Sequence, residues 1–328
     1  MVGVGASTAA ADTVIDSIPV GELPTGVAIT PDGSRVYVTN GGNSRVSVIE
    51  TATNTMVDTI AVWDSPQGVA VTPDGSRVYV AHPFREVVAV IETATNTMVD
   101  VVSVGTLPTG VAVNPSGSHV YVTNQLDDSV SVIETAGNNL VDTVTVGDLP
   151  LGVAVSPEGS RAYVTNVSDK TVSVIDTATN TEVDTIGVGD QPMAVAVNPS
   201  GSHIYVTNQV DNSVSVIETA DNNLVDTVTV GALPSGVAAS PDGSRVYVTN
   251  AGENTVSVID TATNTEVDTI RVGGRPVGVA ATPEGSRVYV ANVDGNTVSV
   301  IAVERCLGSL CIDTGALVGR GSMGSSGS

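Results

Sequence analysis

The stretch that decides the fold is residues 24–40, PTGVAITPDGSRVYVTN, in which two short apolar runs flank a turn. Val, Ile and Tyr favour β-strands, and the segment at 31–34 (PDGS) has the composition of a tight turn. Two further runs follow at 46–50 (VSVIE) and 57–60 (VDTI), again separated by turn residues. The stretch therefore predicts a unit of four short antiparallel strands.

This unit recurs seven times along the chain. Its first proline returns every 42 residues without an insertion, as Pro24, Pro66, Pro108, Pro150, Pro192, Pro234 and Pro276. The first two strands of each unit are apolar or small on both faces, as expected for a sheet that lies between two other sheets. The repeat predicts an all-β fold, a seven-bladed β-propeller of four-stranded antiparallel blades.

The two ends of the repeat region predict how the ring closes. Residues 13–18 (TVIDSI) match only the fourth strand of a unit, and the last unit loses the pattern after Val298–Ile301. We expect the N-terminal strand to complete the last blade and remove two free sheet edges. The propeller then spans 13–303. Residues 1–12 are interpreted as a linker or the stub of a processed signal peptide, and 304–328 as a tail whose last eight residues have the composition of a cloning scar.

The second strand of each unit carries a resemblance to a known family. The sequence YVTN begins at five tyrosines and is relaxed to YVAH and YVAN at two others, which are Tyr37, Tyr121, Tyr163, Tyr205 and Tyr247, then Tyr79 and Tyr289. Over residues 13–301 the chain resembles the YVTN-repeat propellers. The resemblance implies a surface-layer or cell-surface protein, and so a secreted, extracytoplasmic location. It implies no single activity, because such propellers serve as binding scaffolds and, in related families, as lyases or lactonases.

The composition of the chain limits the classes of molecule that it is expected to bind. The net charge of −23, with a single lysine, argues against binding a nucleic acid, which needs clustered Lys and Arg. The sequence has no apolar stretch long enough to cross a bilayer as a helix. We therefore expect a monomeric ring that binds a protein, a glycan or a small ligand. The sequence identifies no cofactor. Cys306 and Cys311 in the tail are either a small disulfide loop or two incidental thiols.

Most charged residues follow the repeat and are interpreted as scaffold. Eighteen of the 35 acids occupy three fixed positions of the unit. His119 and His203 take the place of a recurring arginine after the first turn, so a surface turn role is expected and no metal site is predicted. The Asn that ends most second strands, such as Asn40, is interpreted as a turn-former.

A site normally occurs once, so function is expected where a unit breaks its own pattern. The second unit does so in two loops, the one that leads into its first strand (the leading loop) and the one between its second and third strands (the 2–3 loop). Both loops should emerge on the same face of the ring. The residues concerned include the only Trp and the only Phe of the chain, and are Trp63, Asp64, His82, Phe84, Arg85 and Glu86.

Other departures should surround this group with a rim of mixed charge, at Glu22, Arg275, Gln191 and Met193. The favoured interpretation is a non-catalytic binding scaffold. An alternative is a lyase or hydrolase at the channel mouth, with His82 as the base, Arg85 steadying negative charge and Glu86 beside them. Neutral drift of one blade and a purely structural role as one module of a surface array remain open as well.

Overall fold

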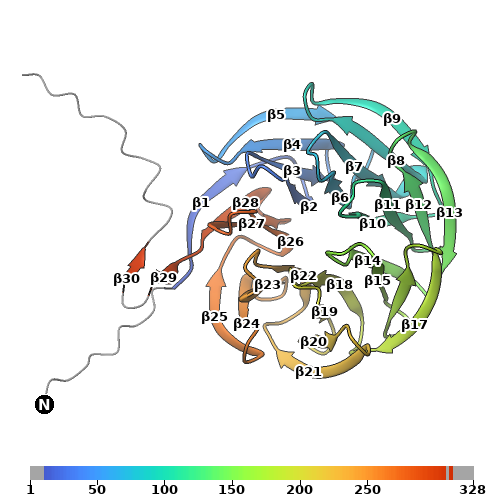
Figure 1. The fold of residues 1–328 in the computed structure, drawn as a ribbon. Helices are drawn as coiled ribbons and strands as arrows, with labels where there is room; N and C mark the ends of the chain where they lie inside the picture. The colour runs from blue at the N-terminus through green and yellow to red at the C-terminus, as the bar shows by residue number, and fades with distance from the viewer. Residues whose placement is uncertain (1–10, 308–309, 313–328) are drawn as a thin grey trace, which may run out of the picture.

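The fold is a closed ring of seven four-stranded antiparallel sheets around a central channel (Figure 1). The computed structural model describes residues 11–307 and 310–312. Within these residues the only helix is η1 (Pro83–Arg85), a single 3-10 turn. The prediction of a seven-bladed propeller is confirmed.

Each blade runs from an innermost strand at the channel to an outermost strand at the rim. In that order, the strands of blades 1 to 7 are β2 (Pro24–Ile29), β3 (Arg35–Asn40), β4 (Arg45–Glu50) and β5 (Thr55–Ala61); β6 (Val69–Val71), β7 (Arg77–His82), β8 (Val87–Glu92) and β9 (Thr97–Ser103); β10 (Pro108–Val113), β11 (His119–Asn124), β12 (Ser129–Glu134) and β13 (Asn139–Thr145); β14 (Pro150–Val155), β15 (Arg161–Asn166), β16 (Thr171–Asp176) and β17 (Thr181–Gly187); β18 (Pro192–Val197), β19 (His203–Asn208), β20 (Ser213–Glu218) and β21 (Asn223–Thr229); β22 (Pro234–Ala239), β23 (Arg245–Asn250), β24 (Thr255–Asp260) and β25 (Thr265–Arg271); and β26 (Pro276–Ala281), β27 (Arg287–Asn292), β28 (Thr297–Ala302) and β1 (Thr13–Pro19).

The hydrophobic core lies between neighbouring blades. The two middle strands of each blade are almost wholly buried, and the tyrosine of one blade packs against the valines of the next, as Tyr37 does against Val78 and Val80. Its hydroxyl donates a hydrogen bond to Asn96 Oδ1 of the next blade at 3.1 Å. Each of the seven interfaces between blades contains one tyrosine, and the rest is filled by small branched side chains. These can fill it because they pack to high density on a pleated surface.

The ring closes through its N-terminal strand, as predicted. β1 pairs antiparallel with β28, from Thr13 opposite Ala302 to Pro19 opposite Thr297. Blade 7 therefore draws three strands from the end of the repeat region and one from its beginning.

A buried carboxylate fastens this closure. Asp12 is 5% exposed, and both of its carboxylate oxygens accept hydrogen bonds from Arg245 Nη1 at 2.7 Å. The Tyr247 hydroxyl donates to Asp12 Oδ2 at 3.1 Å, and the backbone N–H of Glu304 donates to Oδ1 at 2.9 Å. In blade 1 the equivalent position, Asn54, makes the same kind of bonds to an arginine and a tyrosine with an uncharged amide. The closure thus replaces an amide with an ion pair.

After blade 7 the chain forms a separate two-stranded antiparallel sheet of β29 (Arg305–Leu307) and β30 (Leu310–Ile312). Cys306 lies opposite Cys311 in the backbone register. Their side chains lie outside the described residues, and so does the question of a disulfide. Among the described residues no helix has the length and apolarity of a membrane span.

Candidate functional site at the channel mouth

One face of the ring carries both the leading loops and the 2–3 loops, and is called here the loop face. In six blades the two kinds of loop are joined by backbone hydrogen bonds, such as Gly41 N to Leu23 O at 3.0 Å and Gln125 N to Leu107 O at 3.1 Å. Blade 2 has Pro83 at the donor position, which has no N–H. The turns between strands one and two and between strands three and four lie at the other ends of the strands. The opposite face therefore consists of repeated tight turns.

In six blades the second strand ends in an Asn that is buried and braces this face, and the side chain of Asn40 also bonds nearby backbone, as expected. Asn40 is fully buried, and its amide donates to Ser47 Oγ at 3.0 Å and to the Val38 and Arg45 carbonyls at 3.2 Å. It packs so closely on Gly21 of the leading loop that a Cβ there would lie 2.7 Å from Asn40 Cγ. A glycine at this position is therefore required by the asparagine.

Blade 2 replaces this brace with a different one. Where six blades have Gly in the leading loop, Asn at the end of the second strand and Ser on the third strand, blade 2 has Trp63, His82 and Ala89. The Trp63 and His82 rings meet edge to face with centroids 5.7 Å apart, and His82 Nδ1 lies 3.4 Å from the Asp64 carbonyl oxygen. The aromatic pair thus fills the space that Gly and Asn share elsewhere.

This position does not suit His82 to the role of a general base. The side chain is 0% exposed, and Nε2 has no hydrogen-bond partner in the described part of the chain. Burial lowers the pKa of His82, so its imidazole is neutral at pH 7. The same orphaned atom recurs at the asparagine oxygen of blades 1, 4, 5, 6 and 7, which marks it as a feature of the brace.

The rest of the blade 2 group lies at the surface. Phe84 is 69% exposed on η1, and Arg85 Nε donates to Asp64 Oδ1 at 2.8 Å in a salt bridge that leaves both side chains more than half exposed. The hydrogen bond from Arg85 lowers the pKa of Asp64. Glu86 ends the turn with a φ of 55°. This patch stands beside the channel, and none of its members lines the cavity at the channel mouth.

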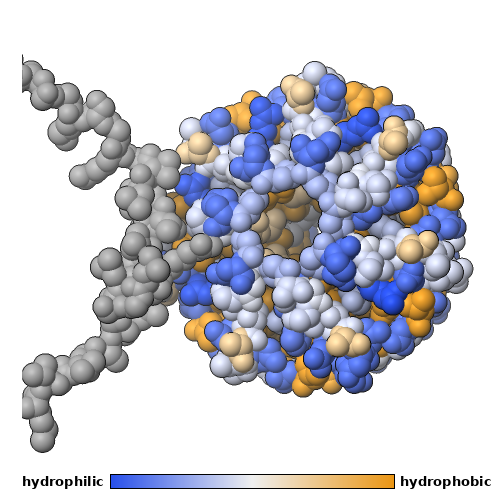
Figure 2. All heavy atoms as spheres, viewed as in Figure 1, coloured by the Kyte–Doolittle hydropathy of each residue, from blue (hydrophilic) through white to orange (hydrophobic). Residues whose placement is uncertain are grey.

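That cavity has a volume of about 470 Å³ and is lined by the leading loops and the 2–3 loops, so it lies on the loop face. The space-filling view shows that the ring is hollow at its centre (Figure 2). Of the residues predicted as rim, Met193 and Arg275 line it, and Glu22 and Gln191 do not. Its other lining residues come from blades 1, 2, 5, 6 and 7, and are Leu23, Thr25, Gly41, Ser65, Gln67, Gln209, Leu233, Ser235, Ala251, Val277 and Val293. Below it a cavity of about 330 Å³ is lined by all seven blades.

The lining combines separate kinds of side chain. Leu23, Met193, Leu233 and Val277 supply apolar surface, while the polar members are hydroxyls and the amides of two glutamines. Arg275 is the single ionisable residue among those that line the cavity, and its Nε also lies 3.1 Å from Asp294 Oδ1. The mouth can therefore hold a small molecule by apolar contact and hydrogen bonds, with one fixed positive charge at its edge.

The sequence carries a second signal for the same face, which is separate from the unusual loops of blade 2. Repeats 3 and 5 (105–146 and 189–230) differ at eight of 42 positions. Six of these differences fall among ten positions, which are the first six residues of the repeat (105–110 in repeat 3) and the four of the 2–3 loop (125–128). Repeats 4 and 6 (147–188 and 231–272) differ at ten positions, of which six fall in the same ten. Near-copies have thus diverged chiefly on the loop face.

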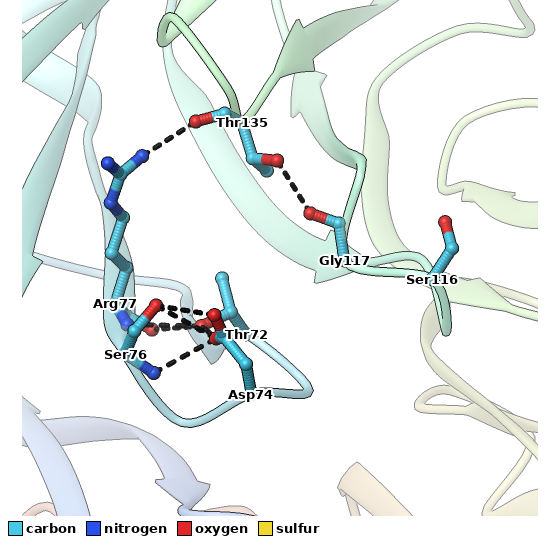
Figure 3. A pocket seen from close by; sticks show the side chains of 7 residues that line it. All are labelled: Thr72, Asp74, Ser76, Arg77, Ser116, Gly117 and Thr135. Atoms are coloured by element: carbon cyan, nitrogen blue, oxygen red, sulfur yellow. Dashed lines mark hydrogen bonds between the residues drawn. The ribbon is translucent and has the colours of Figure 1, made fainter.

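The opposite face carries cavities of another kind. One of about 280 Å³ lies between blades 2 and 3 (Figure 3). Asp74 there accepts hydrogen bonds from Thr72 and Ser76, and Arg77 Nη1 donates to the Thr135 carbonyl of the next blade at 2.6 Å. An equivalent cavity lies between blades 1 and 2, where Asp32 and Arg35 make the same bonds. The Asp and Arg side chains of these cavities recur from blade to blade and bond to neighbouring residues, so we interpret them as structural.

The comparisons with known proteins agree with the fold. A search of curated proteins by sequence gave no match. Among solved structures the chain is similar to Kuenenia stuttgartiensis hydrazine synthase, with a TM-score of 0.79 and 24% identity over 86% of this chain and 96% of that one, which bears on the fold alone. Residues 59–140 and 189–316, more than half of the chain, match the family described as lactonase, 7-bladed beta-propeller. The chain therefore belongs to the seven-bladed β-propeller lactonase family.

Proposed function

We propose that this propeller binds a small organic ligand in the channel mouth of its loop face and does not convert it chemically. The observation that carries the proposal is the divergence between copied repeats, which gathers at the loop face while the remaining positions stay nearly constant. Packing and turn geometry act on every blade alike, so they do not explain why two near-identical blades differ at this face. A ligand that contacts each blade with a different part of itself does.

The geometry of the mouth supports binding of a small molecule. A volume of about 470 Å³ lies in the range of small-molecule sites, and its mixture of apolar surface with a few polar groups is typical of them. The innermost position after the leading proline differs in almost every blade, as Thr25, Gln67, Thr109, Leu151, Met193, Ser235 and Val277. These seven side chains make the wall of a seven-fold scaffold asymmetric, as a single ligand requires.

Hydrolysis of a lactone is the second candidate, and the family name favours it. Ring opening by water needs a group that removes a proton from the water as it attacks the carbonyl carbon. Arg275 can stabilise the negative charge that develops on the carbonyl oxygen, but an arginine stays protonated and cannot be this base. The lining of the mouth offers no carboxylate, imidazole or lysine. Binding without turnover fits the lining better.

The resemblance to surface-layer propellers supports a further part of the proposal, that the protein works outside the cytoplasm. The exposed patch of Phe84 and Arg85 suits an additional contact with a protein, since exposed aromatic and arginine side chains are common at interfaces.

Ligand-observed NMR with a library of neutral, anionic and cationic fragments tests the proposal. We expect fragments that bind the wild-type protein to lose binding in Ser235→Trp, which fills the mouth, and to keep it in Ser200→Trp on the opposite face. Binding that survives Ser235→Trp would refute the mouth as the site. Hydrolysis of γ- and δ-lactones, followed by pH-stat titration, separates the two candidates, and turnover abolished by Arg275→Met would favour the enzyme.

A further inference from the structure

Blade 2 differs from the other blades in the path of its backbone at the channel. In the other six blades the leading proline pairs with the Asn at the end of the second strand, as Pro24 does with Asn40. In blade 2 the first strand, β6, begins only at Val69, and Pro66 has no such pairing in the described sheet. Residues 65–68 have therefore left the regular strand pairing at the channel mouth, although Gln67 N and Gly68 O still bond to the backbone of Ala81 at 3.0 Å.

Buried substitutions explain this change. In five blades a threonine hydroxyl on the second strand accepts a hydrogen bond from the backbone N–H two residues after the proline, as Thr39 does from Gly26 at 2.8 Å. Blade 2 has Ala81 there, so Gly68 N donates instead to the Thr109 carbonyl of blade 3 at 3.0 Å. Blade 7 also has an alanine, Ala291, yet keeps the regular pairing. The shift in blade 2 therefore needs the Trp63–His82 brace as well.

Gln67 faces the mouth from this irregular segment. Its backbone is held by Gln67 N to Ala81 O at 3.0 Å and by Thr39 Oγ1 to Gln67 O at 2.6 Å. Its side-chain amide makes no hydrogen bond within the described residues and lines the cavity. The amide of Gln67 is thus a donor and acceptor that a ligand can use.

Arg275 lines the same cavity from blade 7. Six other blades have Leu, Ser or Gln at this position, so the charge occurs once in the ring. The exposed salt bridge with Asp294 uses one N–H of the guanidinium and contributes little energy, because both side chains are more than half exposed. The remaining N–H groups form a fork that matches a carboxylate.

Resting on the proposed function, we propose that the ligand is a small monocarboxylate with an apolar body. Its carboxylate lies at Arg275 and Gln67, and its apolar part contacts Met193, Leu233 and Val277. Trp63, Ala81, His82 and Ala89 act as positioning residues, since they hold the backbone at Gln67 out of the regular strand pairing without lining the cavity themselves. A phosphate dianion fits less well, because the lining supplies a single cationic side chain.

Isothermal titration calorimetry with hexanoate and its neutral isostere hexanamide tests the inference. We expect hexanoate to bind at least ten-fold more tightly than hexanamide, and Arg275→Met to remove this preference. Arg271→Met, a control that deletes an exposed arginine on the outer strand β25, should leave it unchanged. Gln67→Thr, which restores the residue of blades 1 and 3, should weaken hexanoate binding by at least three-fold.

The positioning role has its own test. The variant with Trp63→Gly, Ala81→Thr, His82→Asn and Ala89→Ser restores the repeat pattern in blade 2 and keeps Gln67. We expect it to weaken hexanoate binding as much as Gln67→Thr does, with an unchanged far-UV spectrum. If it binds hexanoate as the wild type does, the positioning role is wrong.

The outcomes distinguish the inference from the proposed function. Equal binding of hexanoate and hexanamide, or a preference that survives Arg275→Met, overturns the carboxylate assignment and leaves the mouth as a binding site. The carboxylate assignment is also overturned if neither hexanoate nor hexanamide binds, while a fragment of another charge binds the wild-type protein and not Ser235→Trp. If no fragment of any class depends on the mouth, both fail.

Discussion

Replacing Asp12 with alanine should loosen the closure of the ring. Asp12 has a side-chain exposure of 1% and receives hydrogen bonds from Arg245, Tyr247 and the backbone of Glu304. These partners belong to blade 6 and to the segment after β28, so the carboxylate ties together the two ends of the repeat region. Alanine would remove the acceptor from all three.

The magnitude follows from the surroundings of the pair. Breaking a buried ion pair costs about 3–5 kcal/mol, because the remaining charge is left without a partner. The Arg245 side chain is 30% exposed and water can reach it, so the low end, about 3 kcal/mol, applies. At about 2–4 °C per kcal/mol for a large domain, Tm should fall by roughly 6–12 °C.

Differential scanning calorimetry measures this loss, and two matched variants identify its cause. Asp12→Asn, which copies the amide of blade 1, should retain the Tyr247 bond and lose less stability than Asp12→Ala. Asn54→Asp, which copies the closure into blade 1 beside Arg287 and Tyr289, should be neutral or stabilising. A Tm for Asp12→Ala within 2 °C of the wild type would refute the reasoning.

Three further predictions concern the ring and its brace. Deleting Thr13–Pro19 removes the outer strand of blade 7 and exposes an edge of β28, so Tm should fall sharply, and an unchanged Tm would contradict closure by β1. Burial lowers the pKa of His82, so below about pH 6.5 the unfolded chain binds a proton at His82 that the folded protein does not. The free energy of unfolding should therefore decrease as the pH is lowered, by at most about 1.4 kcal/mol per pH unit. Urea unfolding at pH 7.5 and 5.5 should show this loss in the wild type and a smaller loss in His82→Asn; equal losses would mean that His82 titrates normally. Gly21→Ala should cost about 1–3 kcal/mol, since its Cβ would meet Asn40 at 2.7 Å, whereas Gly187→Ala, with no atom within 4 Å of the added Cβ, should be tolerated, and equal effects on Tm would exclude the close approach as the cause.

The sequence by itself determined the architecture. Strand formation, turns and blade number depend on patterns that repeat within a few residues and recur every 42, and the unmatched segment 13–18 showed which strand closes the ring. The copied repeats also indicated the face that carries the candidate cavity, since Thr109 and Met193 differ between two near-identical units.

Which side chains line the candidate cavity was decided by the tertiary structure. His82 looked like an accessible base because its loop is unusual, yet packing against Trp63 buries it completely. Gln67 and Arg275 are 208 residues apart in the numbering and share one cavity only because closure brings blade 7 beside blade 1. Local sequence patterns set the strands, whereas a cavity at the axis depends on side chains from many blades converging once the ring is shut.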